Sequence, residues 1–265
     1  MRIMSIASGS SGNCIYVGSD NAHILIDAGV SRKRICEGLK ETGISVKDLD
    51  AVFLTHEHSD HVKAAGIIMR NDEIPFYSTA GTLNRVVMDR KTGYIDTDLL
   101  NVIKKDHDIV IGDITIKAFG ISHDAADPVA YTVSCGDSKA GVITDLGTYD
   151  GSVLNAMKDC NAFLAEANHD VRMLQSGSYP YDLKRRILSC KGHLSNEDSG
   201  VLISRLLNDD VKAVLLGHLS RENNYDLLAL ETVKQEINLS DTKYTGSDFK
   251  IEVAGPDKPS SIIEI

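Results

Sequence analysis

The segment Thr55-His56-Glu57-His58-Ser59-Asp60-His61 directly follows the apolar run Ala51-Val52-Phe53-Leu54 and contains three histidines and two carboxylates. Neutral imidazole nitrogens suit Zn, Mn or Fe, and a carboxylate compensates the charge of a divalent ion. An apolar run that ends in such a cluster is typical of a buried strand whose carboxyl end delivers ligands to a loop. The chain has nine histidines in 265 residues, so this crowding is not expected by chance. The segment predicts a metal-binding loop.

The size and composition of the chain indicate a globular protein, with 42% hydrophobic and 25% charged residues. No apolar run approaches the roughly 18 residues of a membrane helix, and Met1 to Ala7 resembles a strand rather than a signal peptide. The five cysteines are scattered without a C-x-x-C pair, which favours reduced thiols in a cytosol. We therefore expect a cytoplasmic protein without a membrane segment, folded as a single domain over residues 1–265. Its oligomeric state is not predicted.

The net charge of −10 argues against a broadly basic surface for nucleic acid. Composition does not count bound metals, however. Two divalent ions in one cleft would add four positive charges and could reverse the local potential. The acidic balance is therefore compatible with a phosphate-bearing substrate.

Apolar runs and turn residues predict strands first and strand–helix alternation later. Strands are expected at 2–7, 14–17, 23–26, 51–54, 129–134, 141–144, 162–165 and 211–216, with a hairpin over 109–119 and a β-rich last stretch. Helices are expected at 31–42, 63–70, 79–89, 181–188, 195–207 and 225–237, with Ser31 and Ser195 as N-caps. This mixture suggests helices covering two sheets.

Three of these strands also end in residues that can bind a metal, namely Asp145, Glu166 and His218. His123 follows a further apolar run. Polar residues at the carboxyl ends of strands can converge on one crevice. Each one alone could belong to a surface turn, but together with the histidine cluster they favour a two-metal site.

The ordered set of these residues resembles the metallo-β-lactamase superfamily over nearly the whole chain, and its early structural aspartate corresponds to Asp27. The resemblance implies an α/β fold, the αββα sandwich of four layers with two mixed β-sheets. It also implies two divalent metal ions, Zn²⁺, Mn²⁺ or Fe. The implied ligands are His56, His58 and His123 for one ion, Asp60, His61 and His218 for the other, and Asp145 as the bridge.

The branch of the superfamily decides the chemistry. True β-lactamases lack the bridging aspartate, so Asp145 argues against lactam hydrolysis. The segment between Asp145 and His218 is too short for the large cap of RNA-processing members. The stretch after His218 is too short for the substrate domain of glyoxalase-type thioesterases.

Two further motifs resemble those of tRNA 3′-processing endonucleases, Ala165-Glu166-Ala167-Asn168-His169 and Gly192-His193-Leu194-Ser195. In that group the glutamate orients the histidine, which protonates the departing oxygen. The segment from Gly217 to Asn224 resembles their final motif, with Asn where they usually carry Arg-Tyr. Their long tRNA-clamping arm has no counterpart here. The whole pattern looks most like the YycJ/WalJ-like branch, for which the resemblance implies DNA exonuclease activity.

This resemblance makes Asp60, Glu166 and His193 the expected catalytic residues. A hydroxide held by two ions would attack phosphorus, and His193 would act as the general acid, a task typically worth 10²–10⁴-fold. The Ser10-Ser11-Gly12-Asn13 loop could bind a phosphate, or it is only a tight turn. His169 either supports the site or contacts substrate. The candidate substrate contacts are Ser10, Ser11, Asn13, His169, Ser220 and Asn223.

Lys184-Arg185-Arg186, together with Lys191, is a dense basic stretch. Such a stretch usually forms a solvated helix face, but close to His193 it could contact a nucleic-acid backbone. We predict a metal-dependent phosphodiester hydrolase, a nuclease with DNA as its first candidate substrate. The alternatives are a small-molecule hydrolase (a cyclic or organic phosphodiesterase, or a thioesterase) and a non-catalytic regulator, against which the intact ligand set argues.

Overall fold

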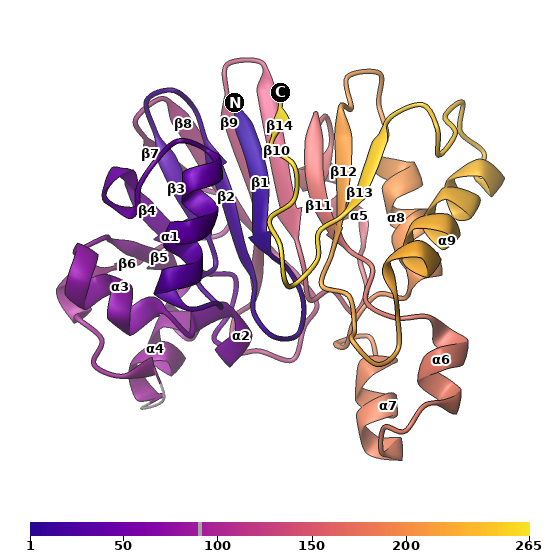
Figure 1. The fold of residues 1–265 in the computed structure, drawn as a ribbon, viewed down its shortest axis with the longest axis horizontal. Coiled ribbons are helices and arrows are strands. Elements are labelled where there is room, and N and C mark those ends of the chain that lie inside the picture. Colours follow the sequence, from indigo (N-terminus) through magenta and orange to yellow (C-terminus); the bar gives the residue numbers. More distant parts are fainter. Residues whose placement is uncertain (90–91) are drawn as a thin grey trace.

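Two β-sheets pack face to face, and helices cover the outer face of each, which gives four layers in the order α, β, β, α (Figure 1). The computed structural model describes residues 1–89 and 92–265, and within them each sheet has seven strands. This architecture confirms the predicted αββα sandwich.

The first sheet has the strand order β14-β1-β2-β3-β4-β5-β6. Strands β14, β1, β2 and β3 pair antiparallel, and β3 to β6 pair parallel, so the sheet is mixed. The bounds are β1 (Arg2–Ala7), β2 (Cys14–Gly18), β3 (His23–Ile26), β4 (Ala51–Phe53), β5 (Phe76–Ser78), β6 (Leu100–Val102) and β14 (Ile263–Glu264).

The second sheet has the order β13-β12-β11-β10-β9-β8-β7 and is also mixed. Strands β7 to β10 form an antiparallel meander, and β10 to β13 pair parallel. The bounds are β7 (Asp108–Ile111), β8 (Ile114–Gly120), β9 (Val129–Cys135), β10 (Ser138–Ile143), β11 (Ala162–Glu166), β12 (Ala213–Gly217) and β13 (Lys250–Val253).

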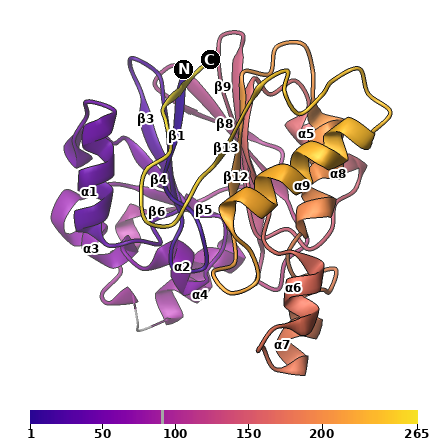
Figure 2. The same ribbon diagram turned by 45° about the vertical axis from the view of Figure 1, so that its right-hand side comes forward.

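The helices divide between the two outer faces, apart from α6 and α7, which project beyond the sandwich (Figures 1 and 2). The first sheet is covered by α1 (Arg32–Glu41), α3 (Ala65–Asp72) and α4 (Ala80–Met88), with the short α2 (Ser59–Val62) at its lower edge. The second sheet is covered by α5 (Gly151–Met157), α8 (Asn196–Leu206) and α9 (Asp226–Leu239). The projecting pair is α6 (Val171–Ser176) and α7 (Tyr181–Ile187), and short 3-10 turns lie at Val46–Asp48 and Thr97–Leu99.

The central strands are buried on both faces, which explains why they form continuous apolar runs in the sequence. Successive side chains of a strand point to opposite faces. Ile24 therefore packs between the sheets, whereas Leu25 packs under the helices of the first sheet. In the same way Leu164 lies in the central layer and Phe163 beneath the helices of the second sheet.

The predicted strands and helices are present, with shifts of one to three residues at most ends. Ser31 and Ser195 are N-caps, since their side chains accept hydrogen bonds from Arg34 N and Asp198 N. The helix expected at 63–70 is displaced and begins at Ala65, because Lys63 ends the short α2.

The unpredicted elements are short. Strands β5 and β6 have three residues each, too few to show a period. Helices α2, α5 and α6 have four, seven and six residues. Helix α5 does have a local signal, the N-cap Asp150, whose side chain accepts from the N–H of Ser152 and Val153.

Candidate metal centre

The residues predicted to bind metal gather at one end of the sandwich, opposite the two chain termini (Figure 1). His56 follows β4, Asp145 follows β10, Glu166 is the last residue of β11 and His218 follows β12. The carboxyl ends of parallel strands lie at one edge of a sheet, which is why residues far apart in the chain meet here.

Three histidine nitrogens converge to form the first group. His58 Nδ1 lies 3.0 Å from His56 Nε2 and 3.3 Å from His123 Nε2. His56 is fully buried and His123 nearly so. Three imidazole nitrogens this close together are a typical set of protein ligands for an ion such as Zn²⁺.

Asp60, His61 and His218 form the second group. Asp60 Oδ2 lies 3.6 Å from both His61 Nε2 and His218 Nε2. Asp145 stands between the two groups, because its Oδ2 is 3.1 Å from His61 Nε2 and its Oδ1 is 3.8 Å from His123 Nε2. One carboxylate within reach of both groups is the arrangement that a bridging ligand requires.

The donor set fits two divalent cations. Asp145 Oδ2 and His218 Nε2 are buried and have no hydrogen-bond partner in the described part of the chain. A buried polar atom without a partner is destabilising, and a cation at this position would bind both atoms. Nitrogen ligands from histidine and oxygen ligands from aspartate suit Zn²⁺, Mn²⁺ or Fe²⁺.

The electrostatics of the group also favour a cation. Burial lowers the pKa of His56, and the neighbouring His61 lowers it further, so its nitrogen is unprotonated and can bind a metal. Burial opposes a charge on His218, but Asp145 and other carboxylates raise its pKa to about 10. The negative charge in this pocket therefore favours a positive partner.

Each of three histidines is fixed through its other ring nitrogen. His56 Nδ1 bonds Thr55 Oγ1 at 3.0 Å. His61 Nδ1 lies 2.7 Å from Asp27 Oδ2, and His218 Nδ1 lies 2.7 Å from Glu166 Oε1. Such partners set the tautomer and orientation of a metal-binding ring.

Asp27 organises the histidine loop from below, as expected for the structural aspartate. It is fully buried and accepts hydrogen bonds from Thr55 N at 2.8 Å and Thr55 Oγ1 at 2.9 Å, in addition to its contact with His61. The role of Thr55 was not predicted, and its position directly before His56 was the available signal.

Three site residues adopt the left-handed backbone conformation that side chains other than glycine rarely take. The φ angles are +64° for Asp27, +57° for Asp145 and +57° for His218, and each residue lies at the end of a strand. Such strain is typical of functional sites.

Glu166 and His193 meet beside this centre, as the motif resemblance implied. Glu166 is fully buried, and its Oε1 accepts from His193 Nδ1 at 2.8 Å and from His218 Nδ1. Its Oε2 accepts from the N–H of Leu146 and Leu194 at 2.8 and 3.2 Å. Burial would raise the pKa of Glu166, but His193 and His218 lower it to about 2, so the carboxylate is ionised.

The glycine- and serine-rich loop packs tightly against the centre. Asn13 is buried, its Oδ1 accepts from Gly9 N at 3.0 Å, and its Nδ2 lies 3.2 Å from His61 Nε2. Gly29 lies under this loop, where a Cβ atom would be 1.6 Å from the carbonyl oxygen of Asp60. Only glycine permits this close approach.

The six candidate substrate contacts divide by exposure. Ser10 and Ser11 are exposed at the rim of the site. The other four side chains are buried, with at most 7% exposure, and the structure does not bring them to the surface: Asn13, His169, Ser220 and Asn223.

A buried amide pair links three loops of the site, and the sequence analysis missed it. Asn224 Nδ2 donates to Asn196 Oδ1 at 2.8 Å and to Ala167 O at 2.9 Å, and Asn196 Nδ2 donates back to Asn224 Oδ1 at 3.0 Å. The departure from Arg-Tyr at this motif marks the segment of Asn224 as unusual, but it does not indicate the partner, which lies 28 residues away.

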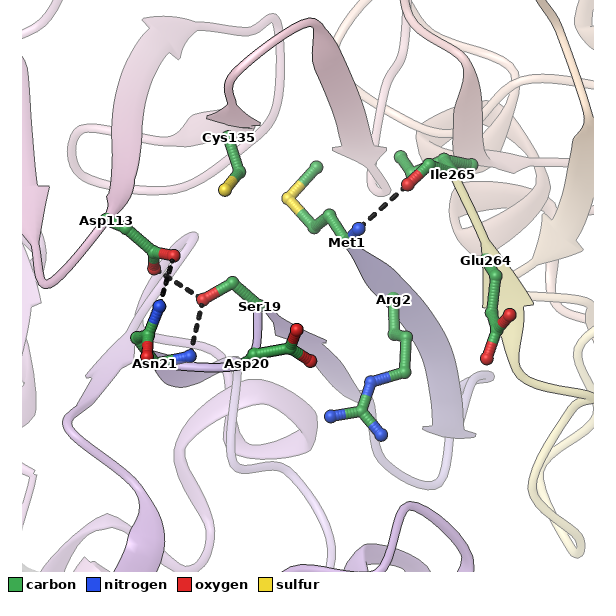
Figure 3. Close-up of a pocket in the computed structure, with 9 residues that line it drawn as sticks. All are labelled: Met1, Arg2, Ser19, Asp20, Asn21, Asp113, Cys135, Glu264 and Ile265. Carbon is green, nitrogen blue, oxygen red and sulfur yellow. Dashed lines mark hydrogen bonds between the residues drawn. The ribbon is translucent and has the colours of Figure 1, made fainter.

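A second polar hollow of about 400 Å³ lies at the opposite end of the sandwich, next to both termini (Figure 3). Its carboxylate Asp113 accepts hydrogen bonds from Ser19 and Asn21, and the Met1 amino group donates to Ile265 O at 2.8 Å. Asp113 and Ile265 O therefore have partners from the protein itself.

The structure also bears on the cysteines and on possible membrane helices. The five cysteines are unpaired, as predicted. Across residues 1–89 and 92–265, each helix is too short or too polar to cross a membrane.

Comparison with known proteins agrees with this geometry. The model of the beta-lactamase superfamily domain matches residues 22–218. The chain is 38% identical to the exodeoxyribonuclease YycJ of Bacillus anthracis over 257 residues, which cover 97% of this chain and 96% of that protein. It is also 38% identical to the exodeoxyribonuclease WalJ of Streptococcus pneumoniae, with 98% and 96% of the two chains covered.

Among solved structures, the metallo-β-lactamase fold protein YhfI from Bacillus subtilis is similar, with a TM-score of 0.70 over 99% of both chains and 16% identity. At this identity the likeness shows a shared fold. It agrees with the two mixed sheets and four layers described above.

Proposed function

Because the chain belongs to the beta-lactamase superfamily domain family, we propose that it is a metal-dependent nuclease that hydrolyses DNA phosphodiesters as an exonuclease. The two relatives named as exodeoxyribonucleases are similar over nearly their whole length, which supports a shared substrate class. We also propose that residues 1–265 form one domain that works in the cytoplasm, where its unpaired cysteines stay reduced.

The observation that carries this proposal is the pair formed by Glu166 and His193 beside the candidate metal centre. His193 Nδ1 bonds Glu166, and the side chain is 18% exposed, so its other nitrogen can reach a substrate. Burial disfavours a charge on His193, but Glu166 raises its pKa overall, which favours the protonated form that a general acid needs. A phosphodiester needs such a donor, because an alkoxide leaves poorly.

We assign His56, His58 and His123 to one ion, Asp60, His61 and His218 to the other, and Asp145 to both. Two divalent ions, Zn²⁺ or Mn²⁺, would polarise phosphoryl oxygens and supply a hydroxide nucleophile at neutral pH. In this arrangement Asp60 would bind its ion from the more exposed side of the site. His193 would deliver the proton to the departing ribose oxygen.

The test is a nuclease assay on 5′- and 3′-labelled single- and double-stranded DNA and RNA with Mn²⁺ or Zn²⁺, beside bis-p-nitrophenyl phosphate. We expect polynucleotide cleavage with DNA preferred, and a loss of about 10²–10⁴-fold in kcat for His193→Ala. The same variant should lose less kcat on bis-p-nitrophenyl phosphate, because nitrophenolate leaves without protonation.

The matched control is His107→Ala, which removes an exposed histidine from the turn before β7. It should cleave as the wild type does. Cleavage of small diesters alone would replace the nuclease with a small-molecule phosphodiesterase. If His193→Ala cut polynucleotides at the wild-type rate, the assignment of the proton donor would be wrong.

A further inference from the structure

The basic stretch before His193 does not form one uniform solvated face. Lys184 Nζ donates to Gln175 O at 2.8 Å and Gly177 O at 2.7 Å, so it ties α7 to the end of α6. Arg185 and Lys191 are exposed, and neither side chain has a hydrogen bond or ion pair within the described residues. Arg186 differs from all three.

Arg186 is turned towards the metal centre and held there. Its Nε donates to Asp124 Oδ2 at 2.5 Å, and Asp124 directly follows the candidate ligand His123. The hydrogen bond with Asp124 raises the pKa of Arg186, and the carboxylates of Asp60 and Asp145 raise it further. The guanidinium therefore lies within electrostatic range of both metal-binding carboxylates.

The backbone around Arg186 fixes this position. After α7 the chain packs on the His123 loop, since Ser122 Oγ donates to Cys190 O at 2.7 Å and His123 Nδ1 lies 3.3 Å from Gly192 O. Gly192 also approaches α7 so closely that a Cβ atom would be 2.1 Å from the carbonyl oxygen of Ile187. The distance from Arg186 to the reacting centre is thus set by tight packing.

The two terminal nitrogens of Arg186 have no protein partner among residues 1–89 and 92–265, and the side chain is 54% exposed. A guanidinium anchored through Nε presents a planar pair of donors in a fixed direction, which matches two oxygens of one phosphate. Helices α6 and α7 project at this end of the molecule (Figure 2).

We propose that Arg186 binds a phosphate that flanks the cleaved one, and that Asp124 is the positioning residue for its guanidinium. This inference rests on the proposed nuclease function. It makes the substrate class a polyanion with at least two phosphates rather than an isolated diester. Its role is binding, because the side-chain contact of Arg186 is with Asp124 and not with the proton donor His193.

The test measures Arg186→Gln on a single-stranded oligodeoxynucleotide and on bis-p-nitrophenyl phosphate, which has no flanking phosphate. We expect KM for the oligonucleotide to rise roughly tenfold with kcat nearly unchanged, because the contact is present before and during the reaction. The dependence of log(1/KM) on log[NaCl] should become shallower by about 0.7. Hydrolysis of bis-p-nitrophenyl phosphate should not change.

Arg185→Gln is the matched control, because it removes an equal charge from the neighbouring exposed position on the same helix. Arg186→Lys keeps the charge without the planar donor pair, so it should restore the salt slope but only part of the KM. If Arg186→Gln does not fold, the comparison of Arg186→Lys with the wild type provides the test.

Two results would overturn the inference while leaving the nuclease intact. One is an unchanged KM and salt slope in Arg186→Gln with an active wild type. The other is an equal loss on both substrates, which would indicate damage to the His123 loop. A wild type that cuts no polynucleotide would instead overturn the proposed function itself, and the flanking-phosphate contact with it.

Discussion

The two ends of the sandwich both contain polar groups, but buried carboxylate and imidazole atoms such as those of Asp145 and His218 lack partners at one of them. At the end near the termini, Asp113 accepts from Ser19 and Asn21 (Figure 3). At the other end, Asp145 Oδ2 and His218 Nε2 are buried and have no hydrogen bond within the described part of the chain. The other atoms of the two groups are close, since Asp145 Oδ1 lies 3.6 Å from His218 Nδ1.

This difference separates a polar cluster that stabilises the fold from one that is arranged for a ligand. A buried atom without a partner costs free energy, and the left-handed backbone at Asp145 and His218 adds strain. A fold retains such a cluster when a bound group compensates for it. The following predictions, from the largest expected effect to the smallest, test this interpretation.

Asp145→Asn should have the largest effect, a loss of at least about 10³-fold in kcat/KM, because an amide cannot bridge two cations as a carboxylate does. Metal content should fall with it. Activity and metal content per chain are measured together.

Asp159→Asn is the control for that change. Asp159 also has a left-handed backbone, with φ of +61°, but it is exposed and precedes β11, at the end of that strand opposite Glu166. Its substitution should leave metal content and activity unchanged. Full activity in Asp145→Asn would remove the distinction between the two ends.

Glu166→Gln should lower kcat by about 10²–10³-fold. Its carboxylate accepts from His193, His218 and two backbone N–H groups, so an amide nitrogen would face a donor wherever it turned. Steady-state kinetics with metal analysis check this, and Glu222→Gln, which changes an exposed carboxylate, is the control. Unchanged kcat would show that Glu166 does not orient His193.

Removing metal with a chelator should lower Tm. Ions at a thousandfold excess over their Kd stabilise by about 4 kcal/mol, which corresponds to roughly 10 °C for a chain of this size. Calorimetry should show one unfolding transition, as the proposed single domain requires. The shift should be absent in Asp145→Asn, and two separate transitions would contradict a single domain.

Asp113→Asn should have the smallest effect. Hydrogen bonds from Ser19 and Asn21 lower the pKa of Asp113 at the surface, and the amide weakens them. Tm should fall by roughly 1 °C with metal binding and catalysis unchanged. A large loss of activity would mean that this end of the sandwich contributes to the reaction.

The sequence predicted the elements with strong local patterns and missed those without them. Apolar runs such as Ala162 to Ala165 showed buried strands, and Ser195 showed a helix start. Three-residue strands such as β5 carry too little pattern, since they are specified by pairing with β4.

The same limit applies to the candidate site. His56 to His61 could be recognised because its ligands lie within one loop. The Asn196–Asn224 pair and the contact of Arg186 with Asp124 could not, because each joins segments far apart in the chain. The burial of His169 and Asn223 likewise depends on packing that no local motif encodes.

By itself the sequence determined which residue types end the strands, the histidine and aspartate set, and through them the class of fold and of chemistry. Only the tertiary structure decided how these residues meet. Asp145 lies between two groups of ligands, Glu166 is shared by His193 and His218, and Arg186 is held at the rim by Asp124. The reason is physical: side-chain chemistry belongs to each residue, whereas distance, burial and unmet hydrogen bonds belong to the packed chain.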